Sequence, residues 1–123
     1  MAAIPSASSA NQILLALSVK MWKKYAGFAL IQKGSPISED KDIWDIAEFF
    51  IMRRFRRKNI GSQIALDLWN RFKGRWQVRV LPANKRARLF WENAITKFAR
   101  KDIVPTEIKI KNDLWLIYQF ESK

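Results

Sequence analysis

The sequence predicts an α/β fold in one domain, with helices packed on a mixed sheet of strands. Short runs of alternating apolar and polar residues are typical of strands, and two longer segments carry the period of amphipathic helices. These elements alternate in the middle of the chain, which ends in a two-stranded hairpin. The length of 123 residues suits one modest core, so we expect residues 1–123 to form a single domain.

The first third of the chain combines an arm, an ambiguous segment and two strands. Residues 1–11 are rich in Ala and Ser and are expected to form a flexible arm. Residues 12–22 are apolar, but their period does not distinguish a helix from a strand. Strands are expected at 25–32 and 43–52, and the acidic, turn-forming segment 33–42 is expected to form an exposed loop between them.

The remainder of the chain begins with a basic segment, 53–62, and then alternates helices with strands. The first helix is expected to end near Gly74, and the second to begin after the capping side chain of Asn84. The turn 111–113 makes a hairpin of the last two strands. The elements expected here are a helix from Ile60 to about Lys73, a strand from Trp76 to Val80, a helix from Asn84 to about Phe98, and strands at 103–111 and 114–120.

The chain is strongly basic, with 23 Lys and Arg against 11 Asp and Glu and a net charge of +12. Fifteen of the basic residues and only two of the acidic ones lie between Arg53 and Lys101, so this segment alone carries +13. Such an excess favours a polyanionic partner: a nucleic acid, an anionic membrane surface or a phosphorylated small molecule.

Composition excludes several classes of chemistry. The chain has neither Cys nor His, which excludes disulfides, thiolate nucleophiles, Ser-His-Asp triads and most zinc sites, so we expect no metal. No apolar run approaches the roughly 20 residues that span a bilayer. The apolar segment 13–17 lacks the basic flank and cleavage site of a signal peptide, so we expect a cytoplasmic protein without membrane contact.

The basic segment lies between a predicted strand and a helix that Gly61 opens. A helix N-terminus presents unpaired N–H groups and a partial positive charge, so a basic, Gly-containing lead-in suits a phosphate group. The segment contains neither a P-loop nor a Gly-x-Gly-x-x-Gly sequence. A solvated basic loop is the alternative, and we favour phosphate binding because a strand and a helix flank the charges.

The segment Ala47 to Ala65, AEFFIMRRFRRKNIGSQIA, resembles the acetyl-CoA-binding segment of the GNAT superfamily of N-acetyltransferases. In that family a strand, the sequence Arg/Gln-x-x-Gly-x-Gly/Ala and a helix follow one another, and here the sequence runs from Arg56 to Gly61. The resemblance continues through 76–81 and the pattern Asn84-x-x-Ala87-x-x-Phe90-Trp91-Glu92, and it covers Tyr25 to about Phe98. It implies a GNAT-like fold with a mixed, mostly antiparallel sheet, flanking helices and a shortened N-terminal part.

The resemblance also implies an acetyl-CoA-dependent N-acetyltransferase, in which an amine acceptor attacks the thioester directly. The strand end would bind the pantetheine arm through its backbone, the following turn would hold the pyrophosphate, and the second helix would complete the site. The implied cofactor-binding residues are Ile51, Met52 and Arg53 at the strand end, Arg56, Arg57, Lys58, Asn59, Ile60, Gly61 and Ser62 in the turn, and Asn84, Phe90 and Trp91 beyond them.

Glu48 is the catalytic base that the resemblance implies, because the family often has a Glu in this strand and the attacking amine must be neutral. A strand-face carboxylate paired with an Arg is the alternative for this residue. For Asn84, capping the second helix and contacting the cofactor are compatible roles.

Three departures from the family pattern bear on function. Asn59 replaces the first glycine of the turn, and Asn tolerates a left-handed conformation better than other non-glycine residues. Trp91 replaces the Tyr that often protonates the leaving thiolate, and an indole cannot act as an acid. Only about two dozen residues precede Tyr25, where the family has a strand and one or two helices, so a homodimer is one way to complete the acceptor side.

Two alternative functions follow from the same residues. One is a degenerate GNAT fold that binds acetyl-CoA without turnover, which the departures at Asn59 and Trp91 would explain. The other is a nucleic-acid-binding module in which Phe55, Trp76 and Trp91 would stack on bases. We disfavour nucleic acid because the chain has no helix-turn-helix, RNA-recognition or zinc pattern, and because this reading does not explain why Gly61 opens a helix.

Overall fold

A computed structural model describes residues 14–21, 24–34, 40–56 and 59–123. They form β1 (Leu14–Met21), β2 (Lys24–Lys33), β3 (Trp44–Ile51), a 3₁₀ helix (Arg53–Phe55), α1 (Ile60–Arg71), β4 (Gly74–Val80), α2 (Lys85–Ala99), β5 (Thr106–Ile110) and β6 (Asp113–Ser122). The expected arm over 1–11 and the motif residues Arg57 and Lys58 lie outside the described residues.

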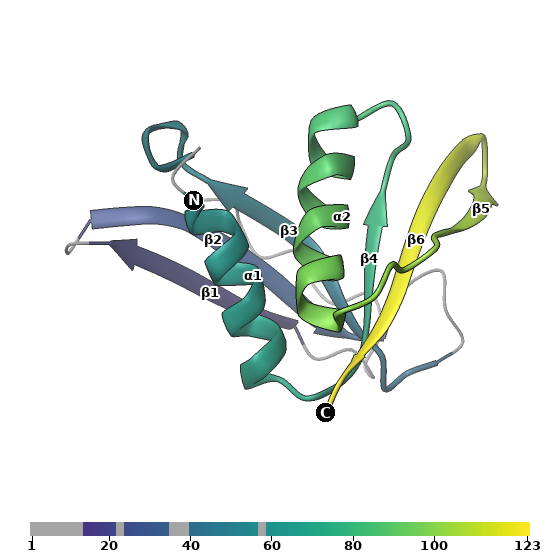
Figure 1. Cartoon of the computed structure of the whole chain (residues 1–123), viewed down its shortest axis with the longest axis horizontal. Helices are drawn as coiled ribbons and strands as arrows, with labels where there is room; N and C mark the ends of the chain where they lie inside the picture. Colours follow the sequence, from purple (N-terminus) through teal and green to yellow (C-terminus); the bar gives the residue numbers. More distant parts are fainter. Residues whose placement is uncertain (1–13, 22–23, 35–39, 57–58) are drawn as a thin grey trace.

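The six strands form one sheet in the order β1-β2-β3-β4-β6-β5. All neighbours are antiparallel except β3 and β4, which run parallel. Both α1 and α2 lie on the same face of this sheet (Figure 1). The predicted mixed, mostly antiparallel sheet with flanking helices is therefore confirmed.

β1 lies in the segment whose sequence period does not distinguish a helix from a strand. It pairs antiparallel with β2 over eight positions, from Leu14 opposite Gln32 to Met21 opposite Lys24. This pairing satisfies the backbone N–H and C=O groups of the segment and makes it a strand. The periodicity of the segment does not show that a partner strand is present.

The other predicted strands and helices are confirmed, and their ends lie within three residues of the predicted positions. β5 begins at Thr106 and not at residue 103, because Pro105 has no backbone N–H to donate and restricts the residue before it. The 3₁₀ helix Arg53–Phe55, inside the expected basic loop, is not predicted by the sequence pattern.

The parallel neighbours β3 and β4 are joined at only two positions, where Trp44 pairs with Trp76 and Asp45 with Gln77. Beyond these positions β3 stays paired with β2, and β4 stays paired with β6. The sheet therefore opens into a V between the C-terminal ends of β3 and β4, and α2 lies in front of this opening (Figure 1).

On the helix-covered face, the junction is held by two indole rings. Trp44 and Trp76 stack with their ring centroids 5.7 Å apart. The Trp44 Nε1–H donates to the Lys73 carbonyl at 3.1 Å, and the Trp76 Nε1–H donates to the Phe72 carbonyl at 2.8 Å. These carbonyls follow the last turn of α1, so the two strands and the end of this helix are fixed together.

On the opposite face, the junction is held by the fully buried carboxylate of Asp45. Arg79 donates to it from Nε at 3.0 Å and from Nη2 at 2.8 Å. The side-chain amides of Gln32 and Gln77 donate to it at 2.7 and 3.3 Å. A buried charge is tolerated when it is paired and hydrogen-bonded in this way, and the partners here come from β2 and β4 on either side.

The hydrophobic core lies between the sheet and the two helices. Trp69 of α1 and Trp91 of α2 meet there with centroids 6.1 Å apart, and the Ser122 hydroxyl at the end of β6 donates to the Trp69 carbonyl. Trp69 and Phe98, expected in the core from their helical spacing, lie in this cluster. Neither described helix combines the length and apolar character needed to cross a membrane.

Replacing Asp45 by Ala is expected to destabilise the fold, because it leaves the largely buried Arg79 guanidinium without a counter-charge. Breaking a buried pair from one side costs about 3–5 kcal/mol of unfolding free energy. Asp67→Ala is the matched control, because it breaks an exposed ion pair with Arg71 that is worth about 0.3–0.5 kcal/mol. Urea denaturation measures both, and equal losses would contradict the role given to Asp45.

Candidate functional site

A cleft lies where β3 and β4 part, bordered by the end of β3, the turn before α1 and the length of α2. Its volume of about 1960 Å³ exceeds the roughly 300–1,000 Å³ that is typical of small-ligand pockets. Because its lining runs along α2 from Asn84 to Lys97, a long ligand suits this cleft better than a compact one.

The cleft brings together most of the residues that the sequence predicts for a cofactor. Those that line it are Ile51, Arg53, Arg56, Asn59, Gly61, Ser62, Asn84, Phe90 and Trp91. Glu48, Met52 and Ile60 do not line it, and Arg57 and Lys58 are outside the described residues. A place in the wall of the cleft shows where a residue lies but not that it binds a ligand, so binding by these residues stays a prediction.

The backbone N–H and carbonyl of Met52 both form hydrogen bonds within the protein. Its N–H donates to the Ala26 carbonyl of β2 at 2.6 Å, and its carbonyl accepts from the Phe55 N–H at 2.8 Å. Met52 therefore has no free N–H for a ligand in the cleft, unlike the role that the sequence predicts for it. Ile60 is buried in the first turn of α1 and contributes to packing.

The turn before α1 has the conformation expected from the sequence. Asn59, the residue in the first-glycine position, is left-handed with φ 62° and ψ 14° and directly precedes the helix. The next-but-one residue is Gly61, where an added Cβ would lie 3.0 Å from a ring carbon of Phe90. A side chain at this position would press on Phe90 inside the cleft, which gives a physical reason for glycine.

Arg56 is held against the end of β3. Its Nε–H donates to the Ile51 carbonyl at 2.8 Å, and its guanidinium lies 5.4 Å from the ring centroid of Phe50. This arrangement uses one of the five donors of the guanidinium and leaves the terminal NH₂ groups for an anion. The bond from Arg56 also occupies one lone pair of the Ile51 carbonyl, which the sequence predicts as a hydrogen-bond acceptor for pantetheine.

On the α2 side, Asn84 caps the helix as predicted. Its Oδ1 accepts from the Ala87 N–H at 3.1 Å. Trp91 is 7% exposed and packs against Phe49 and Phe90, with centroids 5.0 and 4.8 Å apart. The position where the family often has an acidic Tyr is thus part of an aromatic cluster.

A hydrogen bond from Tyr118 of β6 to Glu92 of α2 lies beside the cleft and was not foreseen from the sequence. The Tyr118 hydroxyl donates to Glu92 Oε2 at 2.6 Å, and Arg88 Nε contacts the same oxygen at 3.5 Å. Burial, and then the neighbouring Glu92 carboxylate, raise the pKa of Tyr118 to about 12. The phenol is therefore a persistent donor that ties α2 to the sheet.

The cleft is rich in positive charge. Its described cations are Arg53, Arg56, Arg86 and Lys97, and its described carboxylates are Glu92 and Asp102. Arg86 and Lys97 were not singled out by motif, although the charge excess between Arg53 and Lys101 includes them. Within the described ranges, no three Asp or Glu side chains gather as a metal site would require.

Glu48 is exposed on β3 and lies outside the cleft lining, beside Leu30 of β2. The neighbours of Leu30 along β2, Ala29 and Ile31, belong to the core under the helices, so Leu30 and Glu48 face the other side of the sheet. No Arg of the described residues forms an ion pair with Glu48. Its role as a base stays a prediction.

Neither a protein-family profile nor a curated protein sequence matches this chain. Solved structures do match it. A GNAT-family acetyltransferase from Streptococcus pneumoniae has a TM-score of 0.58 and 21% identity, with 95% of this chain and 70% of that one covered. An acetyltransferase from Thermus thermophilus has a TM-score of 0.64 and 14% identity, with 88% and 64% covered.

The chain has the GNAT acetyltransferase fold. The same fold includes a CoA-dependent acyl-homoserine lactone synthase, BjaI, solved with SAM and isopentyl-CoA, which matches at TM-score 0.58 and 12% identity over 98% of this chain and 63% of that one. The chain spans less than two thirds of this synthase and of the Thermus protein. The GNAT-like fold predicted from the segment Ala47 to Ala65 is confirmed.

The prediction that aromatic side chains form a base-stacking surface for a nucleic acid is wrong. Trp76 is fully buried and Trp91 nearly so, because both rings pack in the core under the helices. Of the three predicted stacking residues only Phe55 is partly exposed, and the Arg54 guanidinium lies 5.1 Å from its ring centroid.

Tyrosinate absorbance provides a direct test of the Tyr118 environment, because the chain has only two tyrosines. We expect the wild-type protein to show a titration step near pH 12 that Tyr118→Phe lacks and Tyr25→Phe keeps. Because the folded pKa lies above the ordinary value of 10, the stabilisation by the phenol is fully present below pH 10. It is lost as the pH rises toward 12. A Tyr118→Phe protein that keeps the step near 12 would refute the assignment.

Proposed function

We propose that the protein is an acyl-CoA-dependent acyltransferase and that it transfers acetyl from acetyl-CoA to an amine. The observation that carries this proposal is the parting of β3 and β4 beside the left-handed Asn59 turn. That geometry puts a free strand edge and a helix N-terminus in one elongated cleft. A ligand with an amide-containing arm and a pyrophosphate matches both features.

The fit of acetyl-CoA follows from residues of the cleft. The edge of β3 that faces away from β2 is unpaired with β4 after Asp45, so it can receive the amides of the pantetheine arm. The first turn of α1, from Ile60 onward, would bind the pyrophosphate with its N–H groups, and Arg53 and Arg56 would add charge. Phe90 and Trp91 would flank the arm with apolar surface.

The chemistry requires one new bond and one broken bond. The amine nitrogen bonds to the thioester carbonyl carbon, the C–S bond breaks, and the proton of the nitrogen passes to a base. We assign the base to Glu48, which lies outside the cleft lining on the far side of the sheet and would therefore reach the amine from that side, directly or through a water. The CoA thiolate takes a proton from solvent in this scheme, because the indole of Trp91 has none to give and Tyr118 holds its own.

A protein that binds acetyl-CoA without turnover is the second candidate, and the buried indole of Trp91 favours it. The two candidates share the cofactor and differ in whether acetyl is transferred to an acceptor. The acceptor class, the homodimer and the cytoplasmic location expected from the sequence stay predictions.

Acetyl-CoA is expected to raise the melting temperature. At a hundredfold excess over Kd the ligand adds about 2.7 kcal/mol, which corresponds to a rise of about 10 °C for a chain of this size. Gly61→Val should abolish most of this rise because its side chain meets Phe90, whereas Gln63→Val on the exposed side of α1 should keep it. No shift of the wild-type protein at millimolar acetyl-CoA would exclude both candidates.

Turnover by the wild-type protein separates the two candidates, and Glu48→Gln tests the assigned base. With a panel of amines as acceptors, an enzyme that uses this base should lose about 10²–10⁴-fold in turnover while its acetyl-CoA-induced thermal shift is unchanged. Glu107→Gln, at an exposed position of β5, is the control and should keep full turnover. Turnover that survives Glu48→Gln would move the base to another residue, and turnover absent from the wild-type protein with every amine would favour the binding protein.

A further inference from the structure

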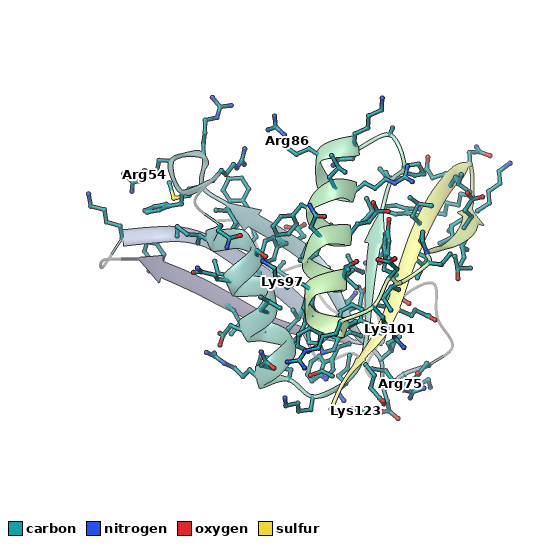
Figure 2. All side chains as sticks on the ribbon, in the orientation of Figure 1. Arg54, Arg75, Arg86, Lys97, Lys101 and Lys123 are labelled. Carbon is teal, nitrogen blue, oxygen red and sulfur yellow. The ribbon has the colours of Figure 1, made fainter. Side chains whose placement is uncertain are left out.

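The exposed side of α2 carries positive charge, and only part of it, Arg86 and Lys97, lines the cleft. Lys85, Arg86, Lys97, Arg100 and Lys101 are all exposed along this helix and its C-terminal end. Figure 2 shows Arg86 at the N-terminal end of α2, Lys97 along its side and Lys101 beyond its C-terminal end. We call these five residues the α2 basic face.

The α2 basic face has no internal counter-charge. The one carboxylate within α2 is Glu92, which Arg88 and Tyr118 already engage. By contrast, Arg71, Arg75 and Arg79 elsewhere pair with Asp67, Asp40 and Asp45. Among the described residues, no ion pair is formed by any member of the α2 basic face.

Helix electrostatics account for only part of this face. Cations near the C-terminal end, such as Lys97 and Arg100, complement the helix dipole. Lys85 and Arg86 occupy the first turn, where the dipole opposes positive charge and where α2 has no acidic residue. The helix dipole therefore does not account for these two positions, of which Arg86 lines the cleft and Lys85 lies outside it.

The length of the face distinguishes between ligands. From Lys85 to Ala99 the helix extends about 21 Å at 1.5 Å per residue, and Arg100 and Lys101 follow its end. One pyrophosphate cannot reach both ends. A nucleic acid repeats its phosphates about every 3.4 Å of axis on each strand, so it presents several anions over this length. A ligand with a repeated phosphate backbone therefore matches the face.

The remaining side chains of the face favour a nucleic acid over an anionic membrane. Leu89, 61% exposed, is the only large apolar residue on this side of α2, whereas membrane-bound helices present a continuous apolar face. Asn93 and Thr96 add hydrogen-bonding groups among the cations. Phe90 lines the cleft with Arg86 and Lys97 but packs against Phe49 and Trp91, so base stacking is not part of the proposal.

We propose that the α2 basic face binds the phosphate backbone of a nucleic acid without sequence preference. Binding is electrostatic and does not depend on acyl transfer. It does not use stacking on aromatic rings, because the core buries the two indoles predicted for that role. Arg86 and Lys97 also line the cleft, so a bound strand passes along its border.

The test is fluorescence anisotropy with a labelled 20-nucleotide RNA and a DNA duplex of equal length, both of mixed sequence, from 50 to 300 mM salt. The wild-type protein should bind at least one probe with a Kd on the order of micromolar at low salt, weakening steeply with salt. The variant is Lys85→Gln, Arg100→Gln and Lys101→Gln together, because none of these residues lines the cleft. Its log–log salt slope should be shallower by about 2 to 3, at 0.7–0.9 per phosphate contact.

The control removes the same charge elsewhere. Lys24, Lys41 and Lys109 are exposed on β2, a turn and β5, and changing all three to Gln should leave the salt slope within about one unit of wild type. Equal effects of the two triple variants, or an affinity that does not respond to salt, would overturn the proposal. So would tighter binding to anionic phosphatidylserine vesicles than to either oligonucleotide. An unchanged acetyl-CoA-induced thermal shift in the α2 variant keeps this result separate from the proposed function.

Discussion

The two-position parallel junction of β3 and β4 is the constraint on which the rest of the structure depends. One face is fixed by the stacked indoles of Trp44 and Trp76, and the other by Asp45 with its guanidinium and amide partners. A longer junction would close the sheet and leave no cleft, and no junction at all would leave two separate half sheets. The strong side-chain contacts compensate for the few backbone pairs.

The chemistry available to the cleft follows from this geometry. β3 contributes its backbone, the Asn59 turn contributes helix N–H groups, and α2 closes the site with Phe90 and Trp91. These are means of binding and orientation. Apart from Glu92 and Asp102 the described lining holds no carboxylate, which suits the proposed transfer of an acyl group that arrives already activated as a thioester.

Local signals in the sequence were sufficient for most elements and for the turn. Helical spacing from Ile60, alternation around Trp76, the left-handed turn at Asn59 and the cap at Asn84 each depend on only a few neighbouring residues, and the structure confirms them. The conformation of β1 depends on its pairing with β2, which its own sequence period does not show. The Tyr118–Glu92 bond joins residues 26 apart, and the outward direction of Glu48 depends on the irregular β2–β3 register between Leu30 and Ile31. No local pattern carries such distant pairings.

The narrow junction also determines how the protein can move. β1 to β3 form one antiparallel unit and β4 to β6 form another, and each is paired over at least five positions between neighbours. A rotation of one unit against the other about Trp44 and Asp45 breaks none of those pairs. α2 contacts both units, through Phe49 of β3 and Tyr118 of β6, so these contacts limit such a rotation and set the width of the cleft.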